Sequence, residues 1–275
     1  MLSPEQRSYF ETFGFLQVKQ AFSSEETAAI IAAFDDVLTQ ARGGEPYGGR
    51  GQSVWSVVEK SPVLSDIVED DRVFEPVAEL LGPGFIWAGA EGNITSHNEH
   101  DWHADRHGES EAAYRRVKVM LYLDPTTKER GALRVIPGSH KGPFHLALAR
   151  PLQDELREPG STGFGVSGRD LPSVPVESQP GDVVFFSQSL FHAVYAGFDG
   201  RRYIALKFAA KPTTDEHLAS LVRYTSNIFD PDAAFVNSDR PRIREIVCPL
   251  LDLKSRAPEP SRRAPSAGMM GPQVR

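Results

Sequence analysis

Short apolar runs separated by turn residues dominate the chain from about residue 84 onward. Each run has four to eight residues and is bounded by Gly, Pro, Asp or Asn, which is typical of β-strands. In chain order, the runs are FIWAGAE, VKVMLYL, LRVI, VPVES, DVVFF, LFHAVYA and YIALKFAA. Because no helical pattern separates these runs, they predict a barrel or a two-sheet jelly roll.

The first forty residues have the pattern of helices instead. Ser3 and Pro4 fit a helix cap followed by a first-turn proline. Ser23 and Glu26 fit a capping box, and the stretch TAAIIAAFDDVL that follows has helical periodicity. We therefore expect a mainly β chain with flanking N-terminal helices.

Length and composition favour one domain. A chain of 275 residues with 40% hydrophobic content is long enough to bury a sizeable core. Residues 142–173 are rich in Pro, Gly and charge, and we expect an active-site lid insertion there. Residues 254–275 contain little that a core would bury, so we predict one domain over 1–253 and a disordered tail.

The charge and the N-terminus narrow the functional classes. A net charge of −7 argues against binding to nucleic acid or to an anionic membrane. No apolar run reaches the roughly 18 residues of a membrane-spanning helix, and the N-terminus lacks the pattern of a signal peptide. Cys248 is the only cysteine, so an intrachain disulfide is excluded and a cytoplasmic location is expected.

The stretch EHDWHADRHGES, residues 99–110, contains three histidines and four carboxylates. His103 and Asp105 are two residues apart, a spacing that places both side chains on one face of a strand. His192, in an apolar run further on, is a candidate third ligand, although a single strand histidine is more often a hydrogen-bonded core residue. Two imidazoles and one carboxylate form the facial triad of non-haem Fe(II) oxygenases.

Four stretches resemble the phytanoyl-CoA dioxygenase family of Fe(II)/2-oxoglutarate-dependent oxygenases. They are FETFGFLQVKQAFSSEET, DWHADRH, VMLYLDPTTKERGALRVIPGSHKGPF and PGDVVFFSQSLFHAVYAGFDGRRYIALKFAA. The resemblance covers about residues 5–210, and the four stretches follow one another in the family's order and spacing. It implies a cupin-like jelly roll, namely a double-stranded β-helix.

The resemblance also implies the chemistry. Iron(II) would be bound by His103, Asp105 and His192, with 2-oxoglutarate as cosubstrate and molecular oxygen as oxidant. The products would be succinate, CO2 and a hydroxylated or otherwise oxidised small molecule. Because relatives that halogenate lack a carboxylate at the position of Asp105, its presence predicts hydroxylation or a related oxidation.

The family places an arginine after the second histidine, where it binds the distal carboxylate of 2-oxoglutarate. Two adjacent arginines, Arg201 and Arg202, fit this position, and alternation along a strand turns only one of them inward. Arg202 has the parity of an apolar face, made by Ile204, Leu206 and Phe208, that would pack on helices. We therefore predict Arg201 as the anchor and keep Arg202 as the alternative.

Three further residues are candidates for binding the cosubstrate. Lys118 and Tyr122 share one face of a predicted strand, and Asn93 lies on the strand that leads to the metal loop. For each of them, ordinary packing is an equally good interpretation. Arg106, Arg115 and Arg116 could attract an anionic substrate, although such a cluster is usually a solvated surface.

The predicted function is oxidation of a small molecule in natural-product biosynthesis or small-metabolite modification. Two alternatives remain open: a cupin-type metal oxygenase that does not use 2-oxoglutarate, and a non-catalytic jelly-roll binding protein. The substrate, the outcome beyond oxidation and the oligomeric state do not follow from the sequence.

Overall fold

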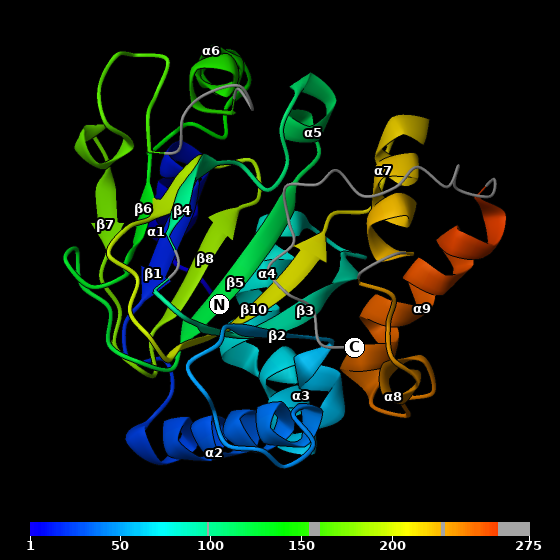
Figure 1. Ribbon diagram of the computed structural model, residues 1–275. Helices are drawn as coiled ribbons and strands as arrows, with labels where there is room; N and C mark the ends of the chain where they lie inside the picture. The colour runs from blue at the N-terminus through cyan, green and yellow to red at the C-terminus, as the bar shows by residue number, and fades with distance from the viewer. Residues whose placement is uncertain (98, 154–159, 227–228, 258–275) are drawn as a thin grey trace.

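The computed structural model describes residues 1–97, 99–153, 160–226 and 229–257. Its centre is a six-stranded antiparallel sheet that faces a smaller antiparallel sheet of four strands (Figure 1). In spatial order, the large sheet contains β1 (Phe15–Val18), β8 (Val183–Ser187), β5 (Arg116–Tyr122), β10 (Arg201–Ala209), β3 (Ile86–Thr95) and β2 (Gln52–Trp55). The small sheet contains β4 (His100–His103), β9 (His192–Val194), β6 (Leu133–Val135) and β7 (Val174–Val176).

Nine α-helices and two 3₁₀ helices surround these sheets in the described part of the chain. The N-terminal ones are α1 (Pro4–Phe13), α2 (Ser24–Ala41), η1 (Val57–Lys60), α3 (Pro62–Glu69) and α4 (Asp71–Leu81). The others are α5 (Glu109–Ala113), α6 (Gly142–Gln153), η2 (Gly168–Asp170), α7 (Asp215–Thr225), α8 (Ala233–Val236) and α9 (Pro241–Arg256). None of the helices in the described ranges combines the length and the apolar character needed to cross a membrane.

Each of the seven apolar runs contains a strand, and both predicted helix starts are confirmed. Ser3 and Ser23 each cap a helix through a complete capping box, with Gln6 and Glu26 as the reciprocal partners. The expectation of a mainly β chain is wrong in its proportions, because helical residues outnumber strand residues. Helices also interrupt the strand series at α5 and α6, and three more follow β10.

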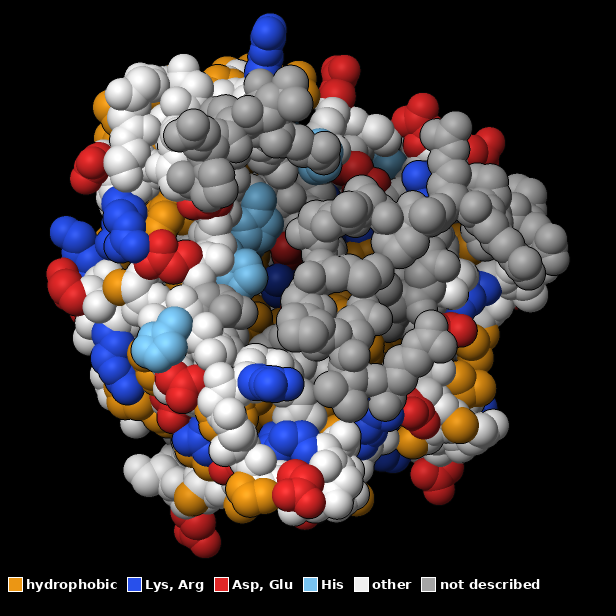
Figure 2. All heavy atoms as spheres, viewed as in Figure 1, with side chains coloured by type: hydrophobic (Ala, Val, Ile, Leu, Met, Phe, Trp, Pro, Cys, Tyr) orange, Lys and Arg blue, Asp and Glu red, His pale blue; other side chains and the backbone are white. Residues whose placement is uncertain are grey.

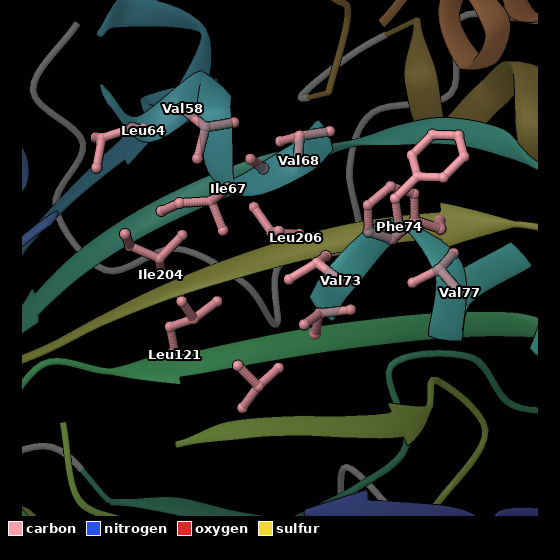
Figure 3. Close-up of a cluster of buried hydrophobic side chains, with 14 of the residues drawn as sticks. Val58, Leu64, Ile67, Val68, Val73, Phe74, Val77, Leu121, Ile204 and Leu206 are labelled. Atoms are coloured by element: carbon pink, nitrogen blue, oxygen red, sulfur yellow. The ribbon is translucent and has the colours of Figure 1, made fainter. Parts of the chain in front are cut away.

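The main core lies between the helices and one face of the large sheet. Leu121 of β5 and Ile204 and Leu206 of β10 point toward side chains of α3 and α4 (Figure 3). Each large apolar side chain buried in this way contributes roughly 1.5–3 kcal/mol. A second apolar cluster, which includes Met120 and Val194, fills the space between the two sheets. The outer face of the large sheet is therefore apolar and helix-covered, and its inner face looks toward the small sheet.

Helices α7 and α9 contact β3 of the large sheet, and α8 contacts α9 and η1 (Figure 1). Helix α9 continues to Arg256, and Lys254 donates a hydrogen bond to the carbonyl oxygen of Thr225 at 3.1 Å. Residue 253, the predicted end of the domain, lies within this helix, and the predicted division into domain and tail stays a prediction. Residues 258–275, the rest of the predicted tail, lie outside the described residues.

Glu59 of η1 gives the fold a specific pH dependence. Burial raises the pKa of its carboxyl to about 7, although the indole N–H of Trp87 and the backbone N–H of Asp232 both donate to it. The folded protein therefore retains this proton to higher pH than the unfolded chain does. As the pH rises from about 4.5 to 7, the free energy of unfolding falls by up to about 3 kcal/mol from this group.

Glu59→Gln should remove this fall, because glutamine does not titrate and any disturbed hydrogen bond costs the same at both pH values. Urea denaturation of both proteins at pH 5 and pH 8 measures the difference. Glu25→Gln, at an exposed position of α2, is the matched control and should keep the wild-type dependence. Equal pH dependence in wild type and Glu59→Gln would contradict the prediction.

Candidate metal centre

Strands β4 and β9 bring two imidazoles together. His103, the last residue of β4, is paired directly with His192, the first residue of β9. Directly opposed residues of an antiparallel pair have neighbouring side chains, and the two ring centroids are 4.3 Å apart. Figure 2 shows histidine side chains near the middle of this face, beside acidic and basic side chains.

Asp105 completes the cluster from just beyond the end of β4. Its Oδ1 lies 4.0 Å from Nε2 of His103 and 3.8 Å from Nε2 of His192. One ligand atom from each of the three residues lies within 4.8 Å of the other two, and no other such group occurs within the described residues. The structure thus brings together the three predicted ligands.

Hydrogen bonds fix which nitrogen of each imidazole faces the cluster. Nδ1 of His103 contacts the carbonyl oxygen of Asp101 at 2.7 Å, and Nδ1 of His192 contacts that of Leu190 at 2.9 Å. Because a carbonyl oxygen only accepts, Nδ1 carries the proton and the lone pair of Nε2 is free. Burial and the neighbouring His103 lower the pKa of His192 to about 3. Both features favour the neutral imidazole that binds metals.

Lys118 of β5 keeps Asp105 ionised and fixes its orientation. Its Nζ lies 3.1 Å from Oδ2 of Asp105 and 3.8 Å from Oε1 of Glu91. Burial, the largest single effect, would raise the pKa of Asp105, but the neighbouring positive charges, with Lys118 the strongest of them, together outweigh burial and lower it. The ammonium lies closer to Oδ2, at 3.1 Å, than to Oδ1, at 3.5 Å, and Oδ1 is the oxygen that faces the two histidines.

A second buried lysine balances the remaining carboxylate. Lys207 of β10 is 2% exposed, and its Nζ lies 3.0 Å from Oε1 of Glu91. Burial lowers the pKa of Lys207 to about 8, against the opposing effect of Glu91. Neither Glu91 nor Lys207 was among the site residues predicted from the sequence. Their inward parity on apolar strands was the available signal, because a charged residue at such a position needs a partner.

Arg201 and Arg202 point to opposite faces of β10, as strand alternation predicted. Arg202 lies on the outer face, where it forms ion pairs with Asp124 at 2.7 Å and Asp35 at 2.6 Å. Arg201 is 1% exposed and donates from Nη1 to the carbonyl oxygen of Gly131 at 2.9 Å. Its Nε has no hydrogen-bond partner among the described residues.

The other three candidates for cosubstrate binding, Tyr122, Asn93 and Lys118, lie in three different surroundings. Tyr122 and Tyr203 flank Arg201, with ring centroids 5.9 Å and 5.2 Å from the guanidinium carbon. Asn93 is buried on β3, accepts a hydrogen bond from Ser53 and leaves its Nδ2 without a partner in the described chain. Lys118 lies at the metal cluster itself, where it contacts Asp105 and Glu91.

The predicted lid segment contacts the metal-bearing strand. It begins with α6, and its later part accepts a hydrogen bond from the indole N–H of Trp102 at the carbonyl oxygen of Gly168, at 2.7 Å. The backbone N–H of Gly160 donates to the carboxylate of Asp101 at 2.8 Å. Residues 154–159 of the segment lie outside the described residues, so its role as a lid stays a prediction.

Among curated proteins, the ectoine dioxygenase of Bordetella parapertussis is 26% identical over 154 residues, which cover 51% of this chain and 50% of that protein. The chain thus spans about half the length of the Bordetella ectoine dioxygenases that it matches. A probable phytanoyl-CoA dioxygenase of Caenorhabditis elegans is 23% identical over 294 residues, covering 90% of this chain and 93% of that protein.

Two solved structures share the fold. HygX from Streptomyces hygroscopicus, with nickel and 2-oxoglutarate bound, has a TM-score of 0.63 at 21% identity, covering 76% of this chain and 88% of its own. EctD from S. alaskensis, in its apoform, has a TM-score of 0.59 at 22% identity, covering 76% and 77%. The profile of the family described as Phytanoyl-CoA dioxygenase (PhyH) matches residues 10–197, more than half of the sequence, and the chain therefore belongs to this family.

Proposed function

We propose that the protein is an Fe(II)/2-oxoglutarate-dependent dioxygenase that hydroxylates or otherwise oxidises a small molecule. One observation carries the proposal: two imidazole Nε2 lone pairs and one ionised carboxylate oxygen converge within 4.8 Å. The same three residues are the ligands that the resemblance to the family implies. We further infer that the two facing sheets form the double-stranded β-helix, or jelly roll, that such enzymes use.

The donor set fits iron(II). A carboxylate and two neutral imidazoles on one side of a metal, with open positions opposite, are typical of non-haem Fe(II) oxygenases. His103, Asp105 and His192 would hold the ion, and Lys118 would hold Oδ2 of Asp105 away from it. Bound iron(II), together with 2-oxoglutarate and oxygen, supplies the oxidising chemistry, with release of succinate and CO2.

The surroundings of Arg201 fit 2-oxoglutarate. A buried guanidinium with an unpartnered N–H is well suited to a carboxylate, because such pairs are strong and directional. Tyr122 and Tyr203 would exclude water from this pair, and the unpartnered Nδ2 of Asn93 is a second available donor. Arg201 would thus orient the cosubstrate toward the triad.

The relatives support a broad class of substrate. The curated relatives include ectoine dioxygenases, and one HygX structure contains hygromycin B. These are small polar molecules, which supports a role in natural-product biosynthesis or in small-metabolite modification. The carboxylate at position 105 supports hydroxylation or a related oxidation in preference to halogenation.

Removing any one of the three ligands should abolish the iron complex. We expect His103→Ala, Asp105→Ala and His192→Ala each to weaken Fe(II) binding by at least about 100-fold, because two remaining ligands hold the metal poorly. Anaerobic titration with Fe(II) and 2-oxoglutarate, followed through the visible charge-transfer absorbance, measures this loss.

His107→Ala is the matched control, since it removes an exposed imidazole two residues beyond Asp105. It should leave the absorbance unchanged. Fe(II) binding without any effect of 2-oxoglutarate would instead favour a cupin-type oxygenase, and no Fe(II) binding at all would favour a non-catalytic binding protein.

Arg201 and Arg202 should separate cleanly in their effect on the cosubstrate. Arg201→Gln removes a buried charged donor, and we expect the KM for 2-oxoglutarate to rise by about 100-fold, the equivalent of roughly 3 kcal/mol. Arg202→Gln should lower the free energy of unfolding through loss of the Asp124 and Asp35 ion pairs, while leaving that KM near wild type. The reverse pattern would make Arg202 the anchor.

A further inference from the structure

A group of polar side chains lies on the inner side of the large sheet, at the opposite end from Arg201. We call it the polar corner and define it as Arg106, Arg116 and Gln188. Backbone hydrogen bonds join the three: the N–H of Arg106 donates to the carbonyl oxygen of Gln188 at 3.0 Å, and the N–H of Gln188 donates to that of Arg116 at 3.1 Å. The ring of Tyr224 on α7 lies near both guanidinium groups: its centroid is 3.9 Å from the guanidinium carbon of Arg106 and 5.6 Å from that of Arg116.

The polar corner holds five buried side-chain atoms without a hydrogen-bond partner among the described residues. They are Nε of Arg106, Nε and Nη1 of Arg116, and both amide atoms of Gln188. Arg116 is 2% exposed and Gln188 is fully buried. A buried donor without a partner costs about 1–3 kcal/mol, so this concentration of unpartnered groups points to a ligand that would satisfy them.

The charge of the polar corner is positive. Two guanidinium groups lie near one ring, and one carboxylate, that of Glu111, reaches Arg116 at 3.6 Å. Nη2 of Arg116 donates a hydrogen bond to the hydroxyl oxygen of Ser220 at 2.7 Å. Oε2 of Glu111 also lacks a hydrogen-bond partner among the described residues, but the two guanidinium groups still outnumber this single carboxylate, so an anion would fit the polar corner better than a cation.

The position of the polar corner relates it to the metal triad. Arg106 directly follows Asp105, and Arg116 lies two residues before Lys118 on the same face of β5, about 7 Å away at roughly 3.3 Å per residue. Tyr122, beside Arg201, lies four residues beyond Lys118 in the other direction. The triad therefore lies between two cationic sites. Arg201 is the site proposed for 2-oxoglutarate, and the polar corner is the other.

We propose that the polar corner binds an oxyanion of the substrate, a carboxylate or a phosphoryl group, and so orients the oxidised carbon a few bonds away from that group. That the anion belongs to a substrate rests on the proposed oxygenase function. Binding of the anion itself depends on neither iron nor turnover.

The test is a calorimetric titration of the full chain with propionate and with methylphosphonate at constant ionic strength. Saturating 2-oxoglutarate occupies Arg201 and prevents binding there. We expect at least one probe to bind to the wild type, and Arg106→Gln and Arg116→Gln to weaken that binding by at least about tenfold. The preferred probe tells a planar carboxylate from a tetrahedral phosphoryl group.

Arg115→Gln is the matched control, because Arg115 is half-exposed and pairs with Glu11 on the surface. It should leave the affinity unchanged. If Arg116→Gln does not fold, Arg106→Gln decides alone. The proposal is overturned if neither probe binds to the wild type, or if Arg106→Gln and Arg115→Gln bind equally well.

A second experiment connects the polar corner to turnover. In a succinate-release screen of acids and their neutral amides, we expect kcat/KM to fall by at least about 100-fold from acid to amide in the wild type. Equal turnover of the amide would overturn the substrate role. A complete lack of succinate release would contradict the proposed function, whereas the titration would still decide whether the polar corner binds anions.

Discussion

The pairing register of β4 with β9 is the constraint on which the rest of the site depends. His103 lies opposite His192, and the next strand of the small sheet, β6, pairs Val135 with the same histidine. Because side chains alternate along a strand, a shift by one residue would turn His192 away from Asp105. Short strands of three and four residues thus fix the geometry of the site, and β9 is held from both sides.

The large sheet has two chemically different faces, and the two carboxylates nearest the histidines on the inner side are each paired with a lysine. Asp105 and Glu91 are matched by Lys118 and Lys207 across β3, β5 and β10. Buried ion pairs seldom stabilise a fold more than apolar packing would, because each charge must be desolvated. The retention of four such charges beside the two histidines is therefore better explained by the orientation of Asp105 than by stability.

Much of the site could be predicted from the sequence because it depends on local spacing. His103 and Asp105 are two residues apart, and the parity of β10 separates Arg201 from Arg202 without any tertiary information. The pairs Lys118 with Asp105 and Lys207 with Glu91 join separate elements, so parity shows that each residue points inward but not which partner it meets. Helix α6 is not predicted by the sequence pattern, because Pro and Gly interrupt it, and the C-terminal helices lie in a stretch without recognisable motifs.

The allocation of charges identifies the place for a dianionic cosubstrate. Lys118 and Lys207 are already shared between two carboxylates, and Arg202 contacts Asp124 and Asp35. At the end of the inner face that carries Tyr122, Arg201 forms no ion pair with any described carboxylate, and its charge is stabilised by aromatic rings and one carbonyl oxygen. A buried guanidinium with so little compensation favours an anionic ligand. Because Lys118 would have to release Asp105 in order to bind 2-oxoglutarate, the same charge balance that orients the metal ligand directs the cosubstrate to Arg201.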